Sequence, residues 1–163
     1  MFALAALVLV GCASPPTTIT APPPKVTLSP RAFDEIASAR SRELALYALS
    51  HIGTPYRYGG SSPETGFDCS GLVHHVYSRA SGLALPRNTE ALSAIGIPVA
   101  ADQLEPGDLV FFDTLRKPYS HVGIYLGDQR FIHAPTSGGH VELVDLRHRY
   151  WQSRFNGARR VAL

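Results

Sequence analysis

The sequence is poor in cysteine and has no long hydrophobic run. Its 163 residues include two cysteines, one tryptophan and one methionine, and only 17% of them are charged. Two cysteines cannot build the disulfide framework of a small secreted scaffold. The apolar run from Phe2 to Val10 is too short to cross a bilayer as a mature helix. The sequence therefore predicts one globular domain, long enough to bury a hydrophobic core.

Basic clusters and closely spaced metal ligands are also missing. The formal net charge is +2, and nothing in the charge pattern favours nucleic-acid binding. We interpret the pair Arg159-Arg160 as the solvated end of a strand. No C-x-x-C or H-x-x-x-H spacing occurs, which argues against a typical zinc site. We expect no nucleic-acid partner, no metal and no other cofactor, and we expect a monomer.

The first residues have the pattern of an export signal. Residues 1–11 contain an apolar run with the length of a signal-peptide core. The run ends in Leu9-Val10-Gly11-Cys12, which resembles the lipobox of bacterial lipoproteins, whose cysteine is lipidated. No Lys or Arg follows Met1, although export signals begin with positive charge, so the true start is expected upstream. Ala13, in place of an aspartate, implies sorting to the outer membrane by resemblance to Gram-negative lipoproteins.

Residues 12–28 are expected to form a tether from the lipidated cysteine to the domain at 29–163. Five prolines lie between Pro15 and Pro24, too many for helix or sheet, which indicates an extended spacer of about 3.1 Å per residue. This order suits an enzyme held on the periplasmic face of the outer membrane. With Cys12 lipidated, Cys69 has no disulfide partner within the chain, which favours a chemical role for its thiol.

The remaining chain changes from helices to strands along its length. Ser29-Pro30 is a helix start, and the helical region is predicted to end by Gly53, with a break near Ser41. Further helices are predicted from Cys69 to about Ala80 with a stop at Gly82, and over 89–95. Strands are predicted at 109–112, 121–126, 130–134, 141–146 and 154–161. Helices followed by an antiparallel meander predict an α+β domain with a five- to six-stranded sheet.

Cys69 is the candidate nucleophile. It follows a Gly/Ser/Pro-rich segment and precedes an apolar run, so we expect it in the first turn of a helix, where unpaired backbone N–H groups favour a thiolate. The alternative is a small, buried, inert side chain. Tyr56 and Tyr58 share a side if their segment is extended. Either Tyr56 offers its hydroxyl to the site near Cys69, or this aromatic loop only packs on the core.

Two of the seven histidines fall on one predicted hairpin. With the turn at Gly127-Asp128, residues whose numbers sum to about 255 face one another. His121 and His133 are therefore expected to be cross-strand neighbours on one face. One imidazole can take the thiol proton while the second fixes its tautomer. The sequence leaves open which of the two faces Cys69.

Other polar residues allow competing interpretations. His74 and His75 do not lie one helical turn from the thiol, and we interpret them as surface or groove-lining residues. Arg87 either binds an acidic substrate or has a structural role. The competing chemical arrangement is a metal site of Cys69, His121 and His133, completed by His140 or an acidic residue.

Five segments, in order, look like the motifs of the NlpC-type cell-wall cysteine peptidases. They are Gly53–Gly60, Phe67–Val73, Pro106–Phe112, His121–Gly127 and Phe131–Ala134, and the ending Tyr150-Trp151 with Ala158–Val161 resembles the small lipoprotein members. The resemblance covers about residues 41 to 162. It implies a papain-like domain in which the Cys-bearing helix packs on an antiparallel sheet. It further implies the following roles: Cys69 as nucleophile, His121 as general base, His133 as orienting residue, Tyr56 near the oxyanion site, and Asp68 and Ser70 in the substrate groove.

The resemblance implies a peptidoglycan endopeptidase that acts on stem peptides through a cysteine thioester. Relatives cut either the γ-D-glutamyl–diaminopimelate bond within a stem or the D-alanyl–diaminopimelate cross-link. A lone domain on a tether favours the cross-link, by analogy alone. Two other classes stay open: a cell-wall-binding lipoprotein without catalysis, and an amidase or acyltransferase on the same fold.

Overall fold

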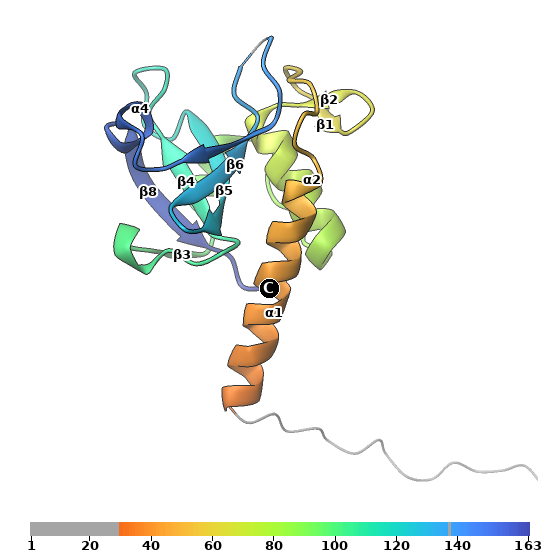
Figure 1. The fold of residues 1–163 in the computed structure, drawn as a ribbon, viewed down its shortest axis with the longest axis vertical. Helices are drawn as coiled ribbons and strands as arrows, with labels where there is room; N and C mark the ends of the chain where they lie inside the picture. Colours follow the sequence, from red (N-terminus) through yellow and green to blue (C-terminus); the bar gives the residue numbers. More distant parts are fainter. Residues whose placement is uncertain (1–29, 137) are drawn as a thin grey trace, which may run out of the picture.

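The computed structural model describes residues 30–136 and 138–163, without the side chains of residues 30–34 and 36. The predicted signal peptide, the lipidation site Cys12 and the tether therefore lie outside the described residues. Two helices, α1 and α2, lie side by side against an antiparallel sheet (Figure 1). The predicted α+β class is confirmed. None of the described helices is both long and apolar enough for a membrane span.

The helices begin and end close to the predicted residues. Helix α1 (Pro30–Leu49) runs unbroken through Ser41, so the predicted break is wrong. No glycine or proline follows Pro30 within it, and buried Leu44 and Ala48 hold its second half on the core. Helix α2 (Cys69–Ser81) ends at Gly82, whose φ of 74° is left-handed, as predicted. The other helical elements are short: α3 (Thr89–Ser93), the 3₁₀ turn η1 (Ala101–Gln103) and α4 (Arg149–Gln152).

The main sheet has the strand order β3-β8-β4-β5-β6-β7, with every neighbouring pair antiparallel. All five predicted strands are confirmed within one or two residues at each end; they are β4 (Leu109–Phe112), β5 (His121–Gly127), β6 (Arg130–His133), β7 (Glu142–Asp145) and β8 (Phe155–Arg160). Three strands of two residues were not predicted, because such short segments show no periodicity; they are β1 (Ser61–Ser62), β2 (Gly66–Phe67) and β3 (Ile97–Pro98).

The core lies on both faces of the sheet. Leu109 and Phe111 of β4 face one cluster, which includes buried residues of α1 and α2. Val110 and Phe112 face a second cluster, against which Trp151 of α4 packs. All four residues of β4 are buried, which explains why this strand is a continuous apolar run instead of an alternating one.

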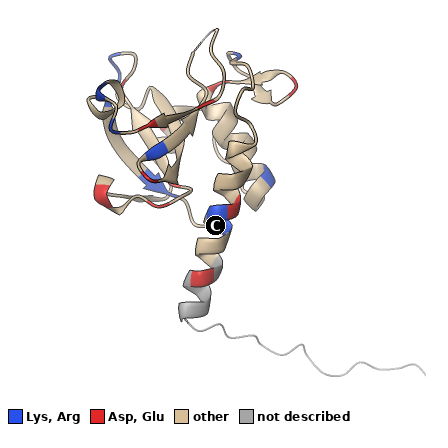
Figure 2. Ribbon diagram, in the orientation of Figure 1, with Lys and Arg blue, Asp and Glu red and all other residues tan. Residues whose placement is uncertain are grey.

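Charges of both signs are interspersed over the described residues (Figure 2), and one ion pair fixes the last strand. Arg159-Arg160 ends β8, as predicted, but Arg160 is ion-paired and not simply solvated. Its Nε lies 2.8 Å from Oδ1 of Asp108, a carboxylate with 1% exposure, and it also pairs with Glu105 at 3.2 Å. Because a buried carboxylate needs a partner, this arginine joins β8 to the turn before β4. Nothing in the sequence around Arg160 or Asp108 indicates this ion pair.

Candidate active site

One cleft brings together most of the predicted site residues. Its lining includes Tyr56, Asp68, Cys69, Ser70, Arg87 and His121. The walls are the loop after α1, the start of α2, the segment before α3 and the loops after β4 and β6. These loops gather at the end of the domain opposite the start of α1 (Figure 1). Cys69 and His121 thus share one cavity although 52 positions separate them in the chain.

Asp68 holds the start of α2. Its Oδ1 accepts a hydrogen bond of 2.6 Å from the backbone N–H of Gly71, which makes it the N-cap of the helix, and its Oδ2 accepts one of 2.9 Å from Gly59. Sequence reasoning placed Asp68 in the groove and missed this role, although an aspartate directly before a helix is a typical cap. The carboxylate therefore sets the position of the next residue, Cys69.

Arg87 supports the structural alternative. Its guanidinium lies 3.3 Å from Oδ1 of Asp68 and donates to the carbonyls of Gly59 and Gly60 at 3.1 and 3.2 Å. The Ser70 hydroxyl, 6% exposed, lies 2.8 Å from the Arg87 carbonyl oxygen. Although these polar groups line the cleft, their hydrogen bonds connect the loop before the helix to the helix start.

The Cys69 thiol is neutral at rest. Burial, followed by the nearby Asp68 carboxylate, raises the pKa of Cys69 to about 11. Backbone N–H groups of Val122, Ser70 and Cys69 itself lower the pKa but do not outweigh burial. The N–H groups at the helix start favour the thiolate, as predicted, but desolvation penalises the charged form more than they stabilise it, so the net shift is upward.

His121 and His133 form a buried pair. Nε2 of His121 lies 2.9 Å from Nδ1 of His133, and the rings are nearly perpendicular at 88°. Trp151 packs against both rings. Burial lowers the pKa of both histidines, so both are neutral. Because Nε2 of His121 is bonded to its partner, Nδ1 is the nitrogen left to meet a thiol proton.

The predicted hairpin register needs a correction. The turn residues are Asp128 and Gln129, both with positive φ, and Gly127 pairs with Arg130. An irregularity between Tyr125 and Gly127 then gives pairs whose numbers sum to 256, such as Ile124 with Ile132. His133 is therefore close to His121 across the hairpin but not directly opposite it. The shared face is as predicted, but it depends on the irregularity, because residues of equal parity face the same side only where the paired numbers have an even sum.

Tyr56 lies beside the thiol. Burial, followed by Cys69 and Asp68, raises the pKa of its hydroxyl. Within the described residues no hydrogen bond engages this hydroxyl, which leaves it able to donate to a ligand in the cleft. The alternative in which this loop only packs on the core explains less, since Tyr58 of the same loop is 89% exposed.

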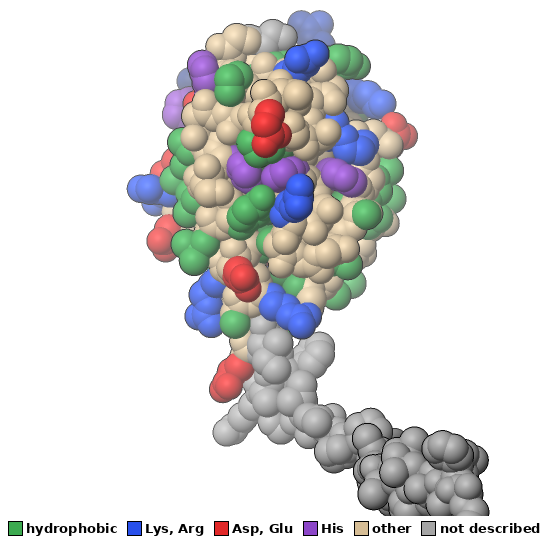
Figure 3. All heavy atoms as spheres, turned by 90° about the vertical axis from the view of Figure 1, so that its right-hand side faces the viewer, with side chains coloured by type: hydrophobic (Ala, Val, Ile, Leu, Met, Phe, Trp, Pro, Cys, Tyr) green, Lys and Arg blue, Asp and Glu red, His purple; other side chains and the backbone are tan. Residues whose placement is uncertain are grey.

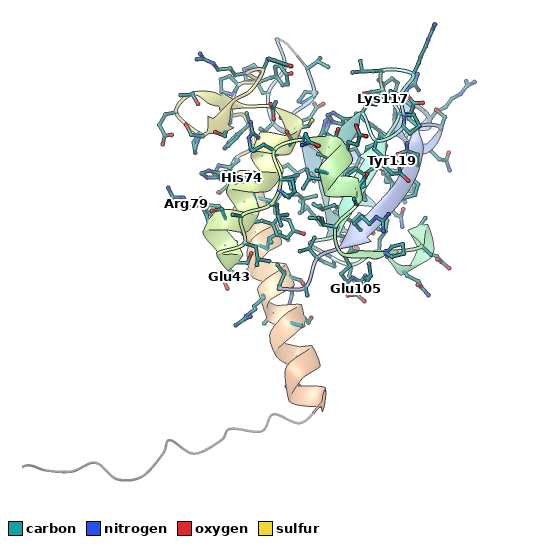
Figure 4. The ribbon with its side chains drawn as sticks, turned by 180° about the vertical axis from the view of Figure 1, so that it is seen from behind. Glu43, His74, Arg79, Glu105, Lys117 and Tyr119 are labelled. Carbon is teal, nitrogen blue, oxygen red and sulfur yellow. The ribbon has the colours of Figure 1, made fainter. Side chains whose placement is uncertain are left out.

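His74 and His75 do not line the cleft. Nδ1 of His74 lies 2.6 Å from the Leu85 carbonyl, and His75 packs against His51 and accepts or donates a 3.1 Å hydrogen bond with Tyr47. Histidines gather on the helical face of the domain (Figure 3). His74 is on the side away from the loop that carries Lys117 and Tyr119 (Figure 4). Of the two predicted alternatives, the groove-lining one is wrong, and both side chains are half-buried.

The competing metal site lacks a converging set of ligands. No group of three or more His, Cys, Asp or Glu side chains within residues 30–136 and 138–163 is arranged to hold an ion. The facing nitrogens of His121 and His133 are bonded to each other and do not point at a common centre. His140 is exposed and bridges to Pro55.

The buried histidines predict a loss of stability in acid. Burial lowers the pKa of His51, His75, His121 and His133 below the ordinary histidine value of 6.5. The unfolded chain therefore binds more protons below pH 6.5, and the stability present above that pH is lost as the pH falls. The slope is up to about 1.4 kcal/mol per pH unit for each fully buried histidine.

Urea unfolding at pH 7.5, 6.5 and 5.5 measures this slope. The His51→Phe variant keeps a ring against Tyr47 and Phe67 and should show a shallower dependence. Equal midpoints at pH 7.5 and 5.5 would contradict the prediction.

Known proteins resemble this chain over most of its length. Residues 53–160 match the model of the NlpC/P60 family. The Escherichia coli K12 protein named murein DD-endopeptidase MepH is 43% identical over 69% of this chain and 43% of its own length. The Bacillus subtilis 168 gamma-DL-glutamyl hydrolase is 46% identical over 69% of this chain and 27% of its own length. The chain thus spans less than half the length of these two relatives.

Another relative matches over nearly its whole length, and a solved structure has the same fold. The E. coli K12 protein named probable endopeptidase NlpC is 42% identical over 97% of this chain and 96% of its own length. A crystal structure of an NlpC/P60 family protein from Bacillus cereus ATCC 10987 superposes with a TM-score of 0.70, at 33% identity over 76% of this chain and 40% of that one. The expected papain-like architecture is thereby confirmed. By family match, sequence identity and fold together, the chain belongs to the NlpC/P60 family.

Proposed function

We propose that the chain is a cysteine peptidase that hydrolyses an amide bond in the stem peptides of peptidoglycan. The observation that carries this proposal is His121 in the wall of the cleft that holds Cys69, hydrogen-bonded to the buried His133. The names of the relatives support it, since MepH is named a murein DD-endopeptidase and the B. subtilis relative a gamma-DL-glutamyl hydrolase.

Because Cys69 and His121 are both neutral at rest, the proton moves as the sulfur attacks. Since burial raises the pKa of Cys69 to about 11, the thiol gives its proton to Nδ1 of His121 as the sulfur attacks the amide carbonyl. The tetrahedral intermediate collapses, the C–N bond breaks, and the imidazolium protonates the leaving amine. A thioester with Cys69 remains. His121 then takes a proton from water, whose oxygen attacks the thioester carbonyl. The C–S bond breaks, the carboxylic acid leaves, and the imidazolium returns its proton to the Cys69 sulfur.

The oxyanion is stabilised at the start of α2. The backbone N–H of Cys69 and the hydroxyl of Tyr56 are the proposed donors, and each such donor contributes about 10²–10³-fold in rate. Asp68 and Ser70 line the same cleft. They hold the helix start that presents the nucleophile, and their cleft-facing sides are proposed to contact the stem peptide.

Two bonds fit the proposal, and we propose the D-alanyl–diaminopimelate cross-link first. The γ-D-glutamyl–diaminopimelate bond is the second candidate, since one relative is named a murein DD-endopeptidase and the other a gamma-DL-glutamyl hydrolase. We also propose that the chain is a monomer anchored at the outer membrane through Cys12. A non-catalytic wall-binding role is the weaker rival, because it gives no reason for the paired histidines beside a thiol.

Digestion of purified muropeptides tests the proposal. The full chain, in detergent, is incubated with cross-linked dimers and with monomers, and the products are identified by mass spectrometry. Monomers released from dimers would establish cross-link cleavage, whereas shortened monomer stems would establish cleavage at γ-D-glutamate. An added amine separates hydrolysis from acyl transfer, which would give an amide product. Unchanged muropeptides in every arm would contradict the proposal, as would activity that a chelator abolishes.

A further inference from the structure

A carboxylate lies behind the two histidines, on the side away from the cleft. His133 has no solvent exposure, and its Nε2 has no aligned hydrogen-bond partner among the described residues. Oε1 of Glu142 nevertheless lies 3.4 Å from this nitrogen. The two residues are cross-strand partners, since β6 and β7 pair His133 with Glu142. The distance suits an electrostatic contact but is long for a well-formed hydrogen bond.

The protons of the histidine pair can be arranged in two ways. A neutral imidazole donates from one nitrogen and accepts at the other. In the first arrangement Nε2–H of His121 donates to Nδ1 of His133, so Nδ1 of His121 is a free acceptor and Nε2 of His133 carries a proton. In the second arrangement both rings hold the opposite tautomer. Nδ1 of His121 then carries a proton and cannot accept one from a thiol.

Glu142 discriminates between these arrangements. The first points a donor, Nε2–H of His133, at the carboxylate. The second points a lone pair at it, so two acceptors face each other without a proton between them. Within the described part of the chain, the other hydrogen bond and the closest ring contacts of His133 are to His121, Phe131 and Trp151. None of these three offers Nε2 an acceptor.

We propose that Glu142 is a positioning residue that accepts the Nε2–H of His133 and thereby keeps Nδ1 of His121 free to take the thiol proton. The negative charge also favours the imidazolium that forms on His121 once the proton has moved. Glu142 has a side-chain exposure of 55%, so water screens its interaction with the histidine pair, and its effect is moderate. The contact shortens when His121 becomes charged, as catalytic hydrogen bonds do on moving from the resting state to the reacting state.

This inference rests on the proposed function, but its test has readouts that need no peptidase activity. The variants are Glu142→Ala, which removes the acceptor, and Glu142→Gln, which keeps an acceptor oxygen without charge. The control is Asp145→Asn on the same strand, whose carboxylate pairs with Arg147. Two readouts are used: histidine tautomers from long-range ¹⁵N NMR, and the pH profile of iodoacetamide alkylation at Cys69, located by peptide mass so that Cys12 does not contribute.

Glu142→Ala should replace the single tautomer of His121 by a mixture and slow the alkylation of Cys69 near neutral pH. In Glu142→Gln the tautomer preference and the alkylation rate should lie between those of Glu142→Ala and the wild type. On muropeptides kcat should fall about tenfold at unchanged KM. That is less than the about 10⁴-fold effect of a carboxylate bonded directly to the base, because Glu142 acts through His133. Unchanged tautomers and alkylation in Glu142→Ala would overturn the inference. A wild type that cleaves no muropeptide, with both readouts altered as expected, would overturn the proposed function alone.

Discussion

Replacement of Cys69 by alanine should reduce muropeptide hydrolysis by at least about 10⁴-fold, to a level at which no product forms in the time of the wild-type reaction. The thiol supplies the electron pair that forms the acyl bond, and no neighbouring group replaces it: the Ser70 hydroxyl is directed at the Arg87 carbonyl. Product formation is measured by mass spectrometry on the same substrates. Because alanine fills most of the space of the thiol, the urea midpoint should change little.

The other cysteine provides the matched control. Cys12→Ala also removes one thiol, but at a position proposed for lipidation, so the detergent-solubilised protein should hydrolyse muropeptides at the wild-type rate. Substantial activity in Cys69→Ala would refute the thioester mechanism. Loss of activity in Cys12→Ala would show that the residues before the domain take part in hydrolysis.

Gly71→Ala should destabilise the domain by about 1–3 kcal/mol through overpacking, and more if the backbone cannot move. A Cβ on Gly71 would lie 1.9 Å from the carbonyl oxygen of Gly60 and 2.4 Å from Nη1 of Arg87. The first contact is with backbone that the Asp68 and Arg87 hydrogen bonds fix. Activity should fall as well, because any shift of this turn moves Cys69. The midpoint of urea unfolding and kcat measure the two effects.

The sign of the stability change in Gly71→Ala is itself informative. Alanine in an unobstructed helix is about 1 kcal/mol more favourable than glycine, so a stabilised Gly71→Ala protein would show that the helix start does not press on the Gly60 loop. Gly82→Ala is the comparison. A Cβ there meets nothing within 4 Å, but φ is +74°, so its cost comes from backbone strain alone, about 1–2 kcal/mol, and activity should be unaffected.

The features predicted from the sequence are those with local signals. The strands β4 to β8 have apolar or alternating patterns, and α2 has a glycine stop. The pairing of His121 with His133 is predicted because both lie on one hairpin, but their shared face depends on the one-residue irregularity in β5, which gives the paired residue numbers an even sum. The ordered motifs extend these signals to a site whose parts lie far apart in the chain.

The features that were missed depend on the tertiary structure. The pairing of Arg160 with Asp108 joins residues 52 positions apart, and neither residue shows in its local sequence that the carboxylate is buried. Asp68 was noticed for its place beside the nucleophile, which concealed its role as a helix cap. The direction of the Cys69 pKa shift also depends on the tertiary structure. The helix end is visible in the sequence, whereas the desolvation caused by the packed walls of the cleft is not.

The neutral state of Cys69 has a consequence for the survival of the protein. Peroxides and disulfides react with thiolates far faster than with thiols. A thiol whose pKa burial raises to about 11 therefore resists sulfenic acid formation and mixed disulfides, although no second cysteine in residues 30–163 could reduce the damage by forming a disulfide. The sulfur therefore reacts mainly when an electrophile is positioned in the cleft and His121 removes the proton. Oxidation of Cys69 should therefore be slow in the resting enzyme, even though no second cysteine of the domain is present to form a disulfide with it.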